Sequence, residues 1–151
     1  MLGFISKLFG SSKSEKDVKK IQPIVEKTLQ HFASYQNLTN DQLRNKTVEF
    51  RQRIKTHLQT IEAEISDANK RAEDLPFNDL MGKDVIYQEV DKLKKQRDKQ
   101  IDEVLDEIMP EAFAVVKETA RRFKENTEII ATATQLDRDL SIKKDYIKID
   151  G

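Results

Sequence analysis

The side chains that most often carry out chemistry in proteins are sparse in this sequence. Among its 151 residues there are two histidines, His31 and His57, and no cysteine. The histidines lie far apart and neither has a carboxylate at the helical spacing of a metal site, so we interpret both as ordinary surface or core residues. The lack of cysteine excludes disulfides, thiolate metal ligands and a cysteine nucleophile, and it is typical of a reducing compartment.

Five acidic residues gather in one stretch and could be imagined as a cation or acid–base site. They are Asp102, Glu103, Asp106, Glu107 and Glu111. Charge runs at helical spacing more often form the solvated face of a helix, and we interpret this run in that way. We also expect Asp106 and Glu107 to lie beside a helix that starts at Pro110, where its positive end favours carboxylates.

Phosphate chemistry lacks its usual motif here. The four glycines, at positions 3, 10, 82 and 151, are too scattered to form a phosphate-binding loop, and Gly82-Lys83 is followed by Asp84 rather than Ser or Thr. There is also no nucleophile elbow and no HExxH zinc motif. We therefore predict no catalytic residue, no bound cofactor and no metal site, and we expect this chain alone neither to bind nor to hydrolyse ATP.

The composition favours long solvated helices. Charged residues make up 36% of the chain and hydrophobic ones 37%, with only 4 Gly and 3 Pro. The 27 basic residues equal the 27 acidic ones, which argues against nucleic acid as a partner because such binding needs a basic excess. The apolar runs are too short to span a membrane. We expect a single cytoplasmic domain.

The N-terminus carries the pattern of a short amphipathic helix, which we expect to be retained rather than cleaved as a signal peptide. Lysines follow this helix closely in the sequence, and such lysines favour binding to an anionic membrane surface. We predict contact with a membrane or partner through the following residues: Phe4, Ile5, Lys7, Leu8, Phe9, Lys13, Lys16, Lys19 and Lys20. The alternative is that the same apolar face packs against the rest of the protein.

The next elements are two helices with a clear boundary between them. Apolar spacing predicts a helix from about Glu15 to Tyr35. Thr39 and Gln42 form a capping box, so that a second helix should start at Asn40. Its apolar positions then alternate spacings of four and three, which is a heptad seam. The seam comprises Leu43, Thr47, Phe50, Ile54, Leu58, Ile61, Ile65, Ala68, Ala72 and Leu75.

A turn at 76–82 and a third helical pattern predict an antiparallel hairpin over residues 40–108, although each helix could instead pair with a second molecule. We expect Pro110 to start a fresh helix, because proline suits the first turn. A short helix should pass through Ile129 and Leu140. The alternating tail 145–151 predicts a lone strand, which suggests a chain cut from something longer.

These elements make the predicted fold mainly all-α. It is a helical bundle with a long antiparallel helical hairpin and one short C-terminal β-strand. We divide the chain into an amphipathic helix over 1–12, N-terminal helices over 13–54, an inserted hairpin over 55–106 and the start of a larger domain over 107–151.

Two stretches of this sequence resemble a known family. The run from Leu38 to Ile54, LTNDQLRNKTVEFRQRI, looks like the pattern LSDEELxxKTxEFRxRL near the start of SecA proteins, the motor ATPases of bacterial preprotein translocation. The run from Ile108 to Glu118, IMPEAFAVVKE, resembles the LLPEAFAVVRE signature that follows in the same family. The apolar opening with its lysines is also similar to the family's N-terminus. The departure is the segment 55–106, which looks like a lineage-specific insertion.

The resemblance implies a function that the residues alone do not. It implies the N-terminal piece of a cytoplasmic ATPase, peripheral on the inner membrane, that exports preproteins through the SecYEG channel. It implies that the domain beginning at 107–151 is the nucleotide-binding motor domain, truncated here. In that family ATP and Mg²⁺ bind downstream of this segment, so no catalytic residue is carried over. The implied partners of the N-terminus are acidic phospholipids and the channel. The alternative is a stand-alone coiled-coil scaffold or membrane-surface adaptor.

Overall fold

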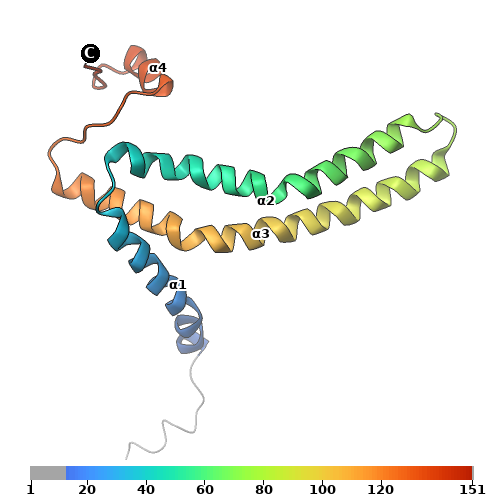
Figure 1. Cartoon of the computed structure of the whole chain (residues 1–151), viewed down its shortest axis with the longest axis horizontal. Coiled ribbons are helices and arrows are strands. Elements are labelled where there is room, and N and C mark those ends of the chain that lie inside the picture. Colours follow the sequence, from blue (N-terminus) through green and yellow to red (C-terminus); the bar gives the residue numbers. More distant parts are fainter. Residues whose placement is uncertain (1–12, 151) are drawn as a thin grey trace, which may run out of the picture.

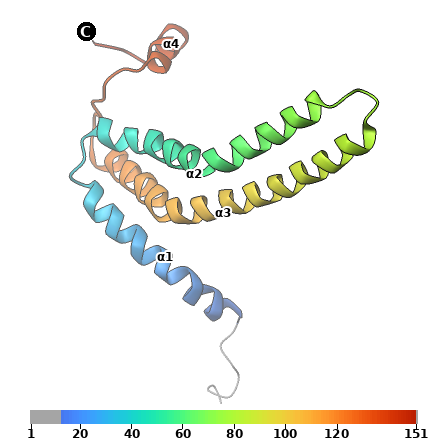
Figure 2. The same cartoon turned by 45° about the vertical axis from the view of Figure 1, so that its right-hand side comes forward.

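The computed structural model describes residues 13–150, in which four helices follow one another and no strand occurs. They are α1 (Lys13–Tyr35), α2 (Asn40–Asp74), α3 (Leu80–Glu125) and α4 (Gln135–Lys143). Helices α2 and α3 lie antiparallel as a long, curved hairpin, and α1 packs against α3 near the open end of that hairpin (Figures 1 and 2). The predicted all-α class and the antiparallel hairpin are confirmed.

Helix α2 begins where its capping box requires. The Gln42 amide donates to the Thr39 hydroxyl over 3.2 Å, and the Thr39 amide donates to the Gln42 side chain over 2.8 Å. These two bonds satisfy backbone groups that a helix end would otherwise leave without partners. The predicted start at Asn40 is therefore confirmed.

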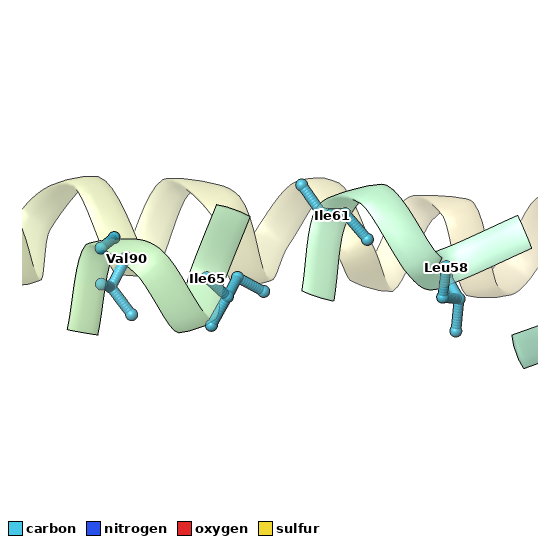
Figure 3. Close-up of a cluster of buried hydrophobic side chains, with 5 residues drawn as sticks. Leu58, Ile61, Ile65 and Val90 are labelled. Atoms are coloured by element: carbon cyan, nitrogen blue, oxygen red, sulfur yellow. The ribbon is translucent and has the colours of Figure 1, made fainter. Parts of the chain in front are cut away.

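The hairpin is held together by the heptad seam. Leu58, Ile61, Ile65 and Ala68 of α2 form a buried cluster with Val90 of α3 (Figure 3). Every predicted seam position except Thr47 is buried or half-buried. Burying each large side chain contributes roughly 1.5–3 kcal/mol, so the seam provides most of the hairpin's cohesion.

The turn between α2 and α3 is shorter than predicted, because α3 starts at Leu80 rather than after Gly82. Pro76 follows the extended Leu75, and Asp79 caps α3 by accepting the Gly82 amide over 2.9 Å. A methyl group on Gly82 would lie 2.5 Å from the Asp79 carboxylate. Glycine thus allows the cap to approach this closely.

Pro110 does not start a new helix, and this part of the prediction was wrong. It is buried inside α3, which continues from Leu80 to Glu125. An interior proline costs about 3 kcal/mol because one backbone hydrogen bond is lost. Ile108 and Ala114, on either side of it, are both buried, so packing along the whole length of α3 outweighs that cost.

The predicted C-terminal strand was also wrong, because residues 145–150 contain a turn and no strand. The Ile147 amide donates to the Lys144 carbonyl over 3.0 Å, and among the described residues no neighbouring strand pairs with the tail. A lone strand has no ladder to stabilise it. The short helix predicted upstream exists as α4, but it starts at a Thr134–Asp137 capping box, and Ile129 and Ile130 lie in the preceding linker.

A second cluster joins α1 to the open end of the hairpin. It consists of Tyr35, Leu43 and Ala114, with Phe32, Leu38 and Val115 packed around them. This cluster fixes the direction in which α1 leaves the hairpin. None of the helices between residues 13 and 150 is long and apolar enough to cross a membrane.

Candidate functional site

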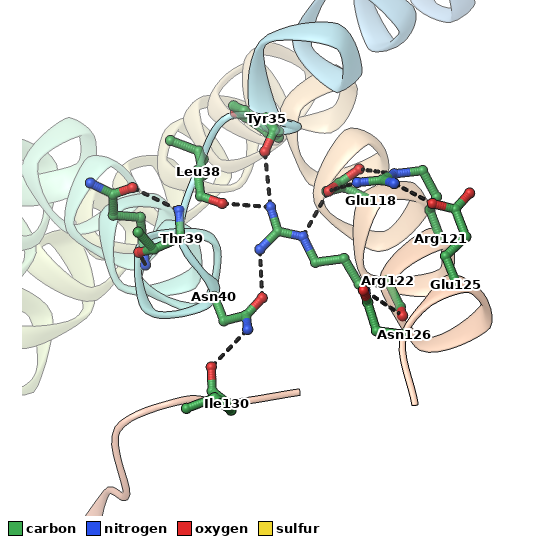
Figure 4. Close-up of polar contacts among 11 residues, drawn as sticks. Tyr35, Leu38, Thr39, Asn40, Glu118, Arg121, Arg122, Glu125, Asn126 and Ile130 are labelled. Atoms are coloured by element: carbon green, nitrogen blue, oxygen red, sulfur yellow. Dashed lines mark hydrogen bonds and ion pairs between the residues drawn. The ribbon is translucent and has the colours of Figure 1, made fainter. Parts of the chain in front are cut away.

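The most connected polar residue is Arg122, which links three parts of the chain at the open end of the hairpin (Figure 4). Its guanidinium donates to the Tyr35 carbonyl over 3.1 Å and to the Leu38 carbonyl over 2.7 Å. It also donates to the Asn40 side chain over 2.6 Å. Arg122 therefore holds the C-terminal end of α1 and the α1–α2 connection against α3.

A buried carboxylate neutralises this arginine. Glu118 is fully buried, and one of its oxygens accepts from Arg122 over 2.7 Å. Arg121 donates to both carboxylate oxygens over 2.8 Å and also pairs with Glu125. The hydrogen bond from Arg121, helped by Arg122, lowers the pKa of Glu118 despite its burial. The cluster thus carries a charge balance that permits its burial.

A second ion pair connects α1, α2 and α3 nearby. Glu111 pairs with Arg53 and accepts from the Tyr35 hydroxyl over 3.2 Å. Burial and the Glu111 charge raise the pKa of Tyr35 to about 12. Burial alone would raise the pKa of Glu111, but the hydrogen bond and charge of Arg53 outweigh it and lower that pKa.

The five-residue acidic run is therefore split by the structure. Asp102, Glu103, Asp106 and Glu107 are exposed, as the interpretation of a solvated face predicts. Glu111 instead belongs to the ion pair with Arg53, so including it in that face was wrong. The helix start expected beside Asp106 and Glu107 does not exist, because α3 runs through.

The chain beyond α3 returns to the beginning of α2 through two carboxylates. Asp41 accepts from the Thr132 amide over 2.8 Å and from its hydroxyl over 2.7 Å, and these bonds lower the pKa of Asp41. Asp137 accepts from Arg44 over 2.7 Å. The Thr134 amide and Arg44 lower the pKa of Asp137 to about 2. These bonds position α4 on the N-terminal end of the hairpin.

Helix α1 leaves one apolar stripe uncovered. Val18, Ile21, Val25 and Leu29 follow one another at spacings of three and four, and each is 42–59% exposed. The neighbouring face of α1 is occupied, since Phe32 and Tyr35 pack in the second cluster. The stripe is thus a continuous surface that the described part of the chain does not cover.

The predicted contact residues fall into two groups. Lys16, Lys19 and Lys20 are exposed on α1, and Lys13 is its first residue. Phe4, Ile5, Lys7, Leu8 and Phe9 lie outside the described residues, so their role stays a prediction. Sequence reasoning used the apolar residues of α1 to predict the helix but did not name them as contact residues.

The polar contacts described above join helices to one another. Over residues 13–150 no group of three His, Cys, Asp or Glu side chains could hold a metal ion. His57 is exposed, and His31 packs beside the Tyr35 ring with their centroids 6.0 Å apart. In the same described residues every buried side-chain polar atom has a hydrogen-bond partner.

Sequence reasoning missed Arg122. It was predicted only to lie on the helix that starts at Pro110. Glu118 precedes it by four residues, which is the spacing of a helical ion pair. Glu118 and Arg122 lie on the Ala114 side of α3, which faces α1 and α2. A charged pair at that spacing on a buried face could have indicated a polar connection between helices.

Fold and site together define an all-α protein with a projecting helical hairpin and an amphipathic helix whose apolar stripe is uncovered. Comparison with known proteins then assigns the family. Residues 5–137 match the model of the SecA DEAD-like domain. The chain belongs to the SecA family.

Individual relatives agree with this assignment. The chain is 43% identical to the protein translocase subunit SecA of Amoebophilus asiaticus, with all of this chain and 13% of that protein covered. It is 39% identical to the SecA subunit of Cytophaga hutchinsonii, again over the whole chain and 13% of the relative. The SecA subunit of Flavobacterium psychrophilum is 43% identical over 97% of the chain. No solved structure matches.

The chain thus spans about 13% of the length of the relatives it matches. Those alignments include the hairpin, so these relatives share the segment 55–106. Its interpretation as an insertion, and the division of the chain into four segments, stay predictions.

Proposed function

We propose that this chain serves as the attachment and scaffold part of a SecA-type protein translocase. In this role α1 and the residues before it contact acidic phospholipids and the SecYEG channel on the cytoplasmic face of the inner membrane. The motor activity, with its ATP, Mg²⁺ and preprotein substrates, belongs to the rest of such a protein. The names of the relatives support the translocase assignment, and the attachment role rests on α1.

The observation that carries the proposal is the stripe of Val18, Ile21, Val25 and Leu29. An amphipathic helix lies in a membrane interface with such a stripe in the apolar layer and its cationic side chains at the headgroups. Lysines 16, 19 and 20 are exposed on the same helix. Near an anionic surface each lysine contributes roughly 1 kcal/mol.

The anchoring of α1 at its C-terminal end supports the same role. Tyr35 is buried against α3, and its carbonyl accepts from Arg122, so the end of α1 is fixed to the scaffold. The stripe begins at Val18, at the other end of the helix. A helix that is fixed at one end presents its apolar stripe, and any membrane bound there, on a defined side of the protein.

Co-sedimentation with vesicles tests the proposal. We expect the chain to pellet with vesicles of phosphatidylglycerol and phosphatidylcholine but not with phosphatidylcholine alone. Binding should weaken as salt screens the lysines. Deleting residues 1–10 should reduce vesicle binding. The Val25→Asp/Leu29→Asp variant should reduce vesicle binding more than this deletion does.

The control is Val48→Asp, because Val48 is also an exposed apolar residue and lies on α2, away from the stripe. This variant should pellet like the parent chain. The attachment role fails if the parent chain stays in the supernatant, or if the α1 variant pellets as well as the Val48 variant.

A further inference from the structure

The far end of the hairpin presents a second apolar surface, unrelated to α1. Phe77, Leu80, Met81 and Val85 surround the turn between α2 and α3, and they are 66–91% exposed. We call these four residues the hairpin tip. Both views place the tip at the opposite end of the hairpin from α1 and α4, so none of the described helices covers it (Figures 1 and 2).

The tip is held out on a stiff support. Ala68 and Ala72 of α2 are fully buried, and Val90 of α3 is 2% exposed, so the seam stays closed close to the turn. Arg71 of α2 bridges to Glu89 of α3 over 2.6 Å. Asp79 caps the start of α3. The exposed side chains therefore lie on ordered backbone.

The charges beside the tip limit what can bind there. Residues 73–85 contain the carboxylates of Glu73, Asp74, Asp79 and Asp84 against the single cation of Lys83, a net charge of −3. Three of the four acids are exposed, and Asp79 is the helix cap. An anionic membrane would be repelled by this surface, and so would the tip of a second copy.

We infer that the hairpin tip binds apolar polypeptide segments that are bordered by Lys or Arg. Such a segment covers the apolar side chains and places its cations beside the carboxylates, which gives charge complementarity. Exposed Met81 suits contacts with varied apolar sequences, since methionine is unbranched and adaptable. The inference is independent of the proposed attachment through α1.

A pair of labelled peptides tests this inference on the full chain. Both have the same core of Leu and Ile, and one is flanked by Lys while the other is flanked by Glu. Fluorescence anisotropy should show saturable binding of the Lys-flanked peptide, with the Glu-flanked peptide weaker by about tenfold. The Phe77→Ser/Met81→Ser variant should bind the Lys-flanked peptide about tenfold more weakly, because apolar burial is lost.

Two further variants separate the apolar and the charged contributions. Asp74→Asn/Asp84→Asn reduces the tip charge from −3 to −1 and should narrow the gap between the two peptides. Val48→Ser, on the surface of α2, should bind like the parent chain. Circular dichroism of every variant should match the parent, because none of the substituted residues is buried.

Several results would overturn the inference. These are no binding of the Lys-flanked peptide, equal binding of both peptides, or an unchanged affinity in the Phe77→Ser/Met81→Ser variant. Vesicle binding lost in that variant would make the tip a membrane contact instead. A dimer in analytical ultracentrifugation that is lost in that variant would make it a self-association surface.

Discussion

At the scale of single residues, the connection between α1 and the hairpin depends on Arg122. Its side chain is 8% exposed and donates to two backbone carbonyls that lie outside its own helix, those of Tyr35 and Leu38. The Tyr35 carbonyl also accepts from the Leu38 amide over 3.1 Å, so removing Arg122 affects the Leu38 carbonyl most. Arg122 therefore contributes to stability through this hydrogen bond as well as through its charge.

We predict that Arg122→Met destabilises the chain by about 3 kcal/mol, the low end of the range for breaking a buried ion pair. The low end applies because Arg121 still neutralises Glu118. Urea denaturation followed by circular dichroism measures this. Arg71→Met is the matched control, since Arg71 also pairs with two carboxylates but is half exposed, and it should cost less than about 1 kcal/mol. Equal losses in the two variants would contradict the role of Arg122.

The raised pKa of Tyr35 leads to a second prediction, which concerns stability at alkaline pH. Its pKa is raised from 10.0 to about 12 in the folded chain, so the unfolded chain releases this proton first. The contribution of the protonated Tyr35 side chain to the free energy of unfolding is therefore complete below pH 10 and is lost as the pH rises from 10 to about 12. Absorbance at 295 nm should show a tyrosinate step near pH 12 that is missing in Tyr35→Phe. A titration curve unchanged in shape by this substitution would contradict the buried contact with Glu111.

At the scale of the helices, the hairpin rests on the seam that the spacing of apolar residues predicted. Ile61 and Ile65 are 3% and 7% exposed and face α3. The helix start at Asn40 was predictable too, because a capping box is a local signal that needs no tertiary information.

We expect Ile61→Asp/Ile65→Asp to unfold the hairpin. Each substitution removes roughly 1.5–3 kcal/mol of apolar burial and adds the cost of burying a charge. The helical signal in circular dichroism should fall strongly, whereas Val48→Asp on the exposed face should retain it. A double variant as helical as the parent would mean that the seam does not hold α2 on α3.

What the sequence could not predict depends on contacts between distant segments. A proline inside a helical pattern usually ends or kinks the helix. Only the packing on both sides of Pro110 explains why α3 continues. The tail 145–150 alternates like a strand, yet an alternating pattern needs a neighbouring strand that the sequence cannot identify. Arg122 was missed for the same reason, since its partners at Tyr35 and Leu38 lie more than eighty positions away.

At the scale of the whole molecule, the described chain has two uncovered apolar surfaces at opposite ends of one scaffold. Helix α1 carries five lysines against three carboxylates over residues 13–35, whereas the hairpin tip has a net charge of −3. We expect this difference in charge to favour different partners for the two surfaces. The polar cluster around Arg122 sits between them and fixes the angle at which α1 leaves the hairpin.

In the proposed function the α1 stripe enters the apolar layer of an anionic membrane, so that binding does not depend on the charge of the lysines alone. The chain has no cysteine, so a single introduced cysteine carries an environment-sensitive fluorophore at one defined position. We would label Val25→Cys on the stripe and Lys27→Cys on the exposed polar side of α1, and add phosphatidylglycerol vesicles. We expect a blue-shifted, brighter probe at position 25 that is quenched by brominated lipid chains, and little change of the probe at position 27. Equal responses at both positions, or no response at 25 while the chain pellets with the vesicles, would contradict it.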